Sequence, residues 1–126
     1  MSTGRRAARR AALFVLYQWD VTGQPLASLY EGELDPYTRE LAEGVAAEAQ
    51  ALDATIGEAS SAWPPERLGA LERNILRIAL YELDRGEVPL EVAIDEAVRL
   101  ARRYSSDDAA KLVNGILGKV AKEAKR

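Results

Sequence analysis

The sequence predicts an all-α fold, a compact helical domain made of two small helix bundles. Good helix formers dominate the composition, since Ala, Leu, Glu, Arg and Lys are all abundant. No segment alternates apolar and polar residues for long enough to require a strand. Apolar residues recur instead at helical spacing, so that each long segment has one apolar face. With 126 residues, the chain can bury a core as one domain.

The N-terminal half contains two long predicted helices. The first extends over residues 4–21 and ends at the Gly- and Pro-containing segment 22–25. A short helical piece follows at residues 26–30. Asp35 is then the predicted N-cap, and Pro36 the first residue, of a helix that extends to about residue 58. The apolar residues of this helix recur on one face, namely Leu41, Val45, Leu52 and Ile56.

A break at the Ser- and Pro-rich segment 60–65 precedes the C-terminal half. We expect it to separate two subdomains, of about residues 1–62 and 63–126, within one domain. A central helix is predicted over residues 70–84, because its apolar stripe is broad enough to face several neighbours. Gly86 is suited to its C-terminal cap.

Two more helices complete the chain. One is predicted over residues 90–104, and the other begins after the N-cap segment 105–108. The acids of this segment lie in the first turn, where the positive end of the helix dipole stabilises them. Asn114 and Gly115 lie inside the apolar repeat of this last helix. We expect its glycines to allow close approach of another backbone, with Asn114 as a buried amide that ties a loop or as a polar contact to a ligand.

The chain lacks cysteine and histidine. This excludes Ser-His-Asp triads, Cys-His pairs and thiolate or imidazole metal sites. The paired acids at 95–96 and 107–108 have no third ligand and no glycine-rich phosphate loop beside them. We therefore expect a protein that is not an enzyme and that uses no metal and no cofactor. No stretch approaches the roughly 18 apolar residues of a membrane span, so the expected location is the cytoplasm, without membrane contact.

The charge of the chain is distributed unevenly. The net charge is −3, from 17 basic and 20 acidic residues. Residues 1–19 carry four arginines and no acid, and residues 111–126 carry five cations and one acid. The segment between them therefore holds −11. Because a partner responds to the local field, two basic ends can attract nucleic acid despite an acidic body. The hypothesis requires that the first and last helices share one face.

Four arginines near the N-terminus are the main candidates for phosphate contacts: Arg5, Arg6, Arg9 and Arg10. Arginine combines a permanent charge with a planar fork that fits phosphate oxygens. The lysines of the last helix extend this candidate RNA site: Lys111, Lys119 and Lys122. Tyr17 and Trp19 could stack on bases, although core packing explains each of them as well. The alternative is a solvated N-terminal helix whose arginines bind nothing specific.

Charged residues also interrupt the apolar stripe of the central helix, at Glu72, Arg77 and Glu82. Ion pairs within the chain are the simplest explanation. The same charges could instead determine specificity for a protein partner. A competing hypothesis for the whole chain is accordingly a helical protein-interaction module, whose acidic middle binds a basic partner while the termini remain inert.

The run Leu71-Glu72-Arg73-Asn74-Ile75-Leu76-Arg77-Ile78-Ala79-Leu80-Tyr81-Glu82-Leu83 resembles the central helix of the NusB family of bacterial transcription antitermination factors. The likeness continues through Val88-Pro89, residues 93–97 and residues 112–117, and the N-terminal arginines match in kind and spacing. It implies an all-helical fold and binding of single-stranded boxA-type RNA from ribosomal RNA leaders, with the ribosomal protein NusE. It further implies a role with NusA and NusG in antitermination by RNA polymerase, without catalysis or cofactor.

The resemblance also implies roles for individual residues. The arginine-rich first helix and Tyr17 fall near the RNA surface, Glu72 and Arg77 near the NusE side, and Asp108 in a segment that influences RNA affinity. Residues 20–36 form a shorter segment than in familiar members. The same module occurs at the N-terminus of some ribosomal RNA methyltransferases, but the chain ends at Arg126, which favours a free-standing factor. Members differ in self-association, and a homodimer could cover the RNA surface.

Overall fold

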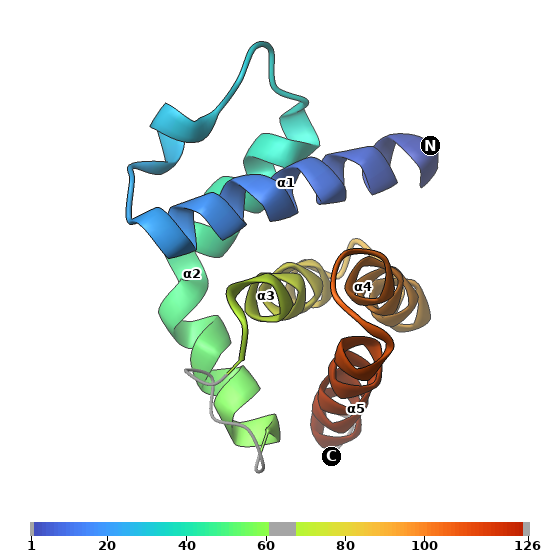
Figure 1. Ribbon diagram of the computed structural model, residues 1–126. Helices are drawn as coiled ribbons and strands as arrows, with labels where there is room; N and C mark the ends of the chain where they lie inside the picture. The colour runs from blue at the N-terminus through green and yellow to red at the C-terminus, as the bar shows by residue number, and fades with distance from the viewer. Residues whose placement is uncertain (1, 61–67, 125–126) are drawn as a thin grey trace.

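The computed structural model describes residues 2–60 and 68–124, and this part of the chain is built from helices without a strand (Figure 1). The elements in chain order are α1 (Ser2–Thr22), η1 (Leu26–Leu29), α2 (Pro36–Ala59), α3 (Ala70–Arg85), α4 (Leu90–Tyr104) and α5 (Asp107–Ala124). The predicted all-α fold is confirmed. Most of the predicted break at residues 60–65 lies outside the described residues.

Local signals in the sequence determine where the helices begin and end. Asp35 caps α2, because its Oδ1 accepts a hydrogen bond from the Tyr37 backbone N–H at 2.8 Å. Gly86 ends α3 in the left-handed conformation, with φ of 69°. Ser106 accepts a hydrogen bond from the backbone N–H of Ala109 at 3.0 Å, at the start of α5. These predicted caps are confirmed.

Helix α3 is the centre of the fold. It packs against α1, α2, α4 and α5, and Figure 1 shows it surrounded by these four helices. Its residues from Asn74 to Glu82 are all buried. The helix contributes large side chains to a core that reaches every other long helix, among them Ile75, Leu76, Ile78 and Leu80. The broad apolar stripe of the sequence predicted a central helix, and α3 is that helix.

Two polar clusters, one buried and one partly buried, fasten α1 to α3. In the first, Nε of Arg9 donates to both carboxylate oxygens of Glu82, at 3.0 and 2.9 Å, and the Tyr37 hydroxyl donates to the same carboxylate. Burial and this hydrogen bond raise the pKa of Tyr37 well above its ordinary value, so the ring remains a neutral donor. The two buried charges satisfy each other through these hydrogen bonds.

The second cluster surrounds Asp20 near the end of α1. One carboxylate oxygen of Asp20 accepts from Arg73 at 2.8 Å, from the Asn74 amide at 3.0 Å and from Arg77 at 3.1 Å. Arg77 also donates to Asp53 of α2, at 2.6 and 2.7 Å. Three helices are thus joined at one point, which limits how α1 can rotate on the core.

Candidate nucleic-acid interface

Helix α1 presents a stripe of cationic and aromatic side chains to solvent. Arg6, Arg10, Phe14 and Tyr17 are spaced by four, four and three residues, which places them on one face of a helix. All four are exposed, and the two rings keep 38% and 40% of their surface accessible. The opposite face of α1 is buried through Ala12, Leu13 and Leu16. Core packing of one face therefore turns the other face outward.

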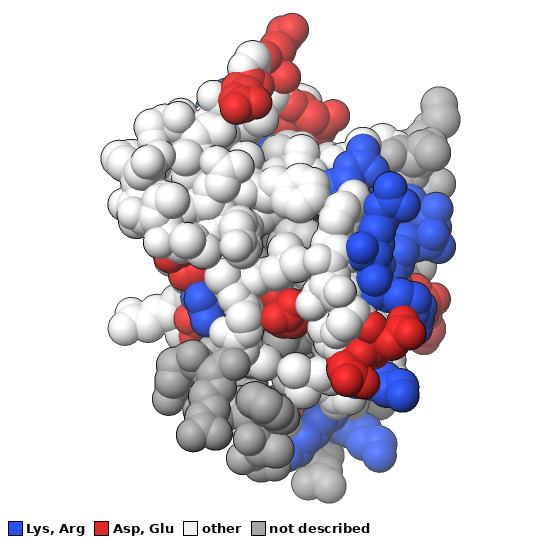
Figure 2. Space-filling view, in the orientation of Figure 1, with Lys and Arg blue, Asp and Glu red and all other residues white. Residues whose placement is uncertain are grey.

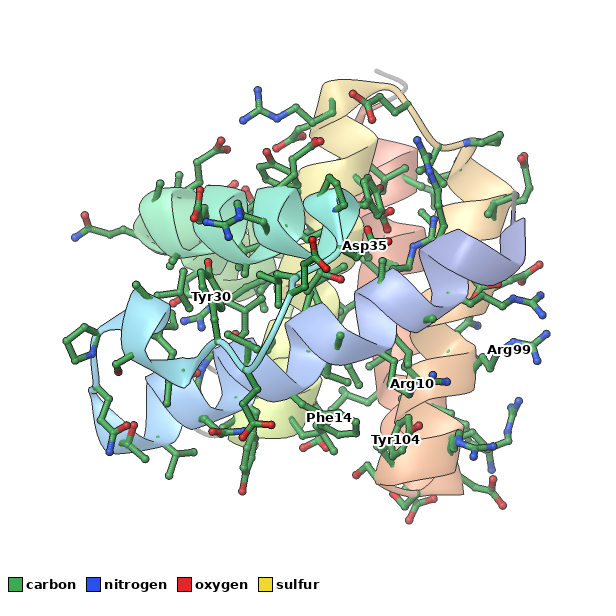
Figure 3. The ribbon with its side chains drawn as sticks, turned by 90° about the horizontal axis from the view of Figure 1, so that it is seen from above. Arg10, Phe14, Tyr30, Asp35, Arg99 and Tyr104 are labelled. Carbon is green, nitrogen blue, oxygen red and sulfur yellow. The ribbon has the colours of Figure 1, made fainter. Side chains whose placement is uncertain are left out.

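A groove separates this stripe from α4. It has a volume of about 210 Å³. Its lining residues are Arg6, Arg10, Glu96, Arg99, Leu100, Arg103 and Tyr104. Figure 3 shows Phe14 of α1 pointing toward Tyr104 of α4, with Arg10 and Arg99 further along the same helices. Figure 2 shows Lys and Arg side chains gathered on the side where α4 and the N-terminal end of α1 lie.

Two direct contacts cross the groove. Nε of Arg6 donates to Glu96 Oε1 at 2.8 Å, and the Glu96 side chain is only 11% exposed. The rings of Phe14 and Tyr104 meet edge to face, with centroids 5.0 Å apart and planes at 82°. The guanidinium of Arg103 lies over the Tyr104 ring, 5.5 Å from its centroid. The groove thus has guanidinium groups along its length and aromatic rings at one end.

The four N-terminal arginines do not form one solvent-exposed flank as expected. Arg9 is 4% exposed and its guanidinium is bound to Glu82, so its predicted role as a phosphate ligand is wrong in this structure. Arg5 lies over the Tyr37 ring, 4.5 Å from its centroid, and 3.8 Å from Glu87. Successive residues of a helix are turned by about 100°, so neighbouring arginines face different surroundings.

The charges predicted on the central helix prove to be internal ones. Arg77 and Glu82 are 5% and 3% exposed, and both are bound within the chain by the two polar clusters. They cannot provide a partner surface, because breaking a buried pair leaves an uncompensated charge. The ion-pair interpretation is confirmed for both. Glu72 is half-buried in the first turn of α3, with a carboxylate oxygen close to Gly69.

The first and last helices, which were expected to share one face, do not pack closely against each other. α5 packs against α4, α2 and α3, and Figure 1 places it below α4, on the side away from α1. The predicted ligands Lys111, Lys119 and Lys122 are exposed on α5, and Asp108 is exposed in its first turn. The cations that face the α1 stripe come from α4 instead.

Several smaller expectations are corrected. Asn114 is exposed rather than buried, and a Cβ added at Gly115 or Gly118 would meet no atom within 4 Å. No second backbone therefore lies close to these two glycines. Trp19 packs partly against the core, as one interpretation held, whereas Tyr17 is exposed.

Sequence reasoning overlooked the arginines of α4. Arg99, Arg102 and Arg103 were not singled out from the sequence, although this cluster of three arginines within five residues was a usable signal. Over residues 2–60 and 68–124, no group of three or more acidic side chains is placed to hold a metal ion. None of the helices in these ranges is long and apolar enough to cross a membrane. The fold and the groove define a helical protein with a cationic, ring-bearing face suited to nucleic acid.

Comparisons with known proteins specify the family. A family model for the NusB family matches residues 6–122. The transcription antitermination protein NusB of Rubrobacter xylanophilus is 46% identical over 120 residues, which cover 90% of this chain and 86% of that protein. NusB of an Anaeromyxobacter species is 40% identical over 131 aligned positions, covering 96% and 92%. The chain belongs to the NusB family, and the resemblance seen in the sequence is confirmed.

Solved structures agree with this assignment. A chain in the crystal structure of antitermination factors NusB and NusE in complex with dsRNA has a TM-score of 0.85 at 27% identity, covering 98% of this chain and 99% of that chain. T. maritima NusB has a TM-score of 0.82 at 32% identity, covering 94% and 91%. The helical arrangement described above is therefore the one shared by this family.

Proposed function

We propose that this protein is a transcription antitermination factor that binds boxA-type RNA of ribosomal RNA leaders. In this proposal it acts with the NusE ribosomal protein, and in a complex with NusA and NusG, to support processive transcription by RNA polymerase in the cytoplasm. Family membership supports it, as does the likeness to a chain crystallised with NusE and RNA. The single observation that carries it is the exposed stripe of Arg6, Arg10, Phe14 and Tyr17 on α1.

The stripe combines the two interactions that single-stranded RNA requires. Guanidinium groups bind phosphates irrespective of sequence, and exposed rings stack on bases that are not already stacked in a duplex. Sequence preference then arises from a few base contacts and from the surface shared with the protein partner. In this proposal the protein acts by binding rather than by catalysis: Glu96 is bound by Arg6, and Asp107 and Asp108 lie in the first turn of α5.

A salt titration tests this function. We expect the affinity for a labelled boxA-like RNA to fall linearly with the logarithm of salt concentration, with a slope of about −0.7 per phosphate neutralised. The double variant Arg6→Ala/Arg10→Ala should flatten the slope by about 0.7 to 1.4, because Arg10 has no acidic partner whereas Arg6 is also bound to Glu96. The matched control is Arg39→Ala/Arg85→Ala, which removes two exposed arginines paired with Glu43 and Glu48 elsewhere on the surface.

Addition of NusE separates this function from that of a protein-interaction module. Tighter RNA binding in the presence of NusE is the expected result. If NusE binds and RNA contributes nothing at any salt concentration, the interaction module is the correct function. An equal change of slope in the control variant would show that the effect depends on net charge rather than on the α1 stripe.

A further inference from the structure

Most arginines of this protein are neutralised by a nearby carboxylate. Over the described residues, eight arginines have an acidic partner within 4.0 Å: Arg5, Arg6, Arg9, Arg39, Arg73, Arg77, Arg85 and Arg102. In the same part of the chain, three arginines have none, and these are Arg10, Arg99 and Arg103. The body of the protein is acidic, so the lack of partners at these three positions needs an explanation.

The three unpaired arginines all line the groove between α1 and α4. Like charges that share one site repel each other, and this repulsion does nothing for folding. The only carboxylate in the groove lining is Glu96, which is already bound by Arg6. With four arginines and one glutamate, the lining has a net charge of +3. A bound anion would neutralise this positive charge.

We propose that Arg10, Arg99 and Arg103 bind consecutive phosphates of a single RNA strand, and that α4 thus supplies two of these three phosphate ligands. The inference rests on the proposed function and specifies the path of the RNA. The guanidinium fork matches two phosphate oxygens, and a groove with arginines on both walls orients the backbone along its length. Neither Arg99 nor Arg103 was among the residues predicted from the sequence.

The aromatic end of the groove determines which form of RNA fits. Phe14 is 38% exposed, and Tyr104 touches it edge to face rather than covering it. A base next to the bound phosphates can therefore stack on Phe14, which requires a base free of its own stack. In a duplex the bases are paired and stacked, so the rings would gain nothing. The groove consequently selects an unpaired strand.

The experiment compares three variants, among them Arg6→Ala/Arg10→Ala from above, and a control by equilibrium binding at four salt concentrations. The probes are a boxA-like single strand and the same sequence annealed to its complement. Arg99→Ala/Arg103→Ala should flatten the salt slope for the single strand by about 1.4, as the loss of two phosphate contacts requires. Phe14→Ala should weaken the single strand about 5- to 150-fold without changing the slope. Arg39→Ala/Arg85→Ala should retain both affinity and slope.

Each outcome has a separate meaning. If the unmodified protein binds no RNA, the proposed function fails. If it binds and Arg6→Ala/Arg10→Ala flattens the slope while Arg99→Ala/Arg103→Ala does not, the α4 site is overturned and the function stands. Equal affinity for the duplex, or no effect of Phe14→Ala, overturns the stacking of a base at the aromatic end. Circular dichroism of each variant verifies folding, which these exposed side chains should not affect.

Discussion

The buried pair of Arg9 and Glu82 allows a decisive test of what the N-terminal arginines do. Their side chains are 5% and 2% exposed, and each satisfies the other. Replacing Arg9 by Met preserves the approximate volume but leaves the Glu82 carboxylate buried with only the Tyr37 hydroxyl as a donor. Breaking a buried pair in this way costs about 3–5 kcal/mol of the free energy of unfolding. We expect a loss of this size for Arg9→Met.

The corresponding change in melting temperature follows from the length of the chain. Unfolding entropy is about 2.1 cal/mol/K per residue near the midpoint, which for 126 residues is about 0.26 kcal/mol/K. Each kcal/mol therefore lowers the midpoint by about 4 °C, and Arg9→Met should lower it by about 10–20 °C. Thermal unfolding followed by circular dichroism, or by calorimetry, measures this directly.

A triple variant separates stability from binding. Arg9→Met/Glu82→Leu/Tyr37→Phe removes the buried charges and the hydroxyl together, and should recover most of the lost stability, because apolar groups of similar volume often replace a buried pair without loss. The Tyr37 ring that supports Arg5 is retained. Its RNA salt slope should equal that of the unmodified protein. A midpoint within 3 °C for Arg9→Met, or a flatter slope for the triple variant, would refute the structural role and restore Arg9 as a phosphate ligand.

Three substitutions elsewhere test the packing, each by urea unfolding. Gly44→Ala should cost about 1–3 kcal/mol, because its Cβ would lie 2.3 Å from the buried Tyr81 ring; an unchanged midpoint would mean that the ring moves freely. Gly115→Ala should add about 0.5–1 kcal/mol, since the new methyl meets no atom and alanine favours the helix; a loss would reveal a hidden contact. Asp35→Ala should cost about 1 kcal/mol through the lost N-cap of α2, whereas Asp35→Asn should retain most of it.

Helix boundaries and the family were accessible from the sequence because the signals are local. Asp35 and Pro36 act within one turn of the helix they start, and Gly86 needs only its own backbone conformation. The identity of the central helix also follows from one continuous run of residues with a broad apolar stripe. These features depend on contacts between near neighbours in the chain, which periodicity and turn chemistry describe well.

The different contacts of the individual arginines could not be predicted from such local signals. Arg9 and Arg10 are adjacent and chemically identical, yet one is bound to Glu82 in the core and the other lines the groove. Their difference depends on how α1 is rotated on α3, which the contacts of Asp20 with α3 help to set. The net charge of a segment cannot predict this difference, because it does not tell which carboxylate lies next to each arginine.

The helical elements, their ends and the family thus follow from hydrogen bonds and apolar spacing that operate over a few residues. The packing of the helices, in contrast, places Arg10 of α1 in one groove with Arg99 and Arg103 of α4, whereas α5 does not line it. Local patterns cannot show this, because these residues are about 90 positions apart in the chain. Their proximity follows from the packing of the buried faces of α1 and α4 on α3. This packing determines which exposed side chains lie next to one another.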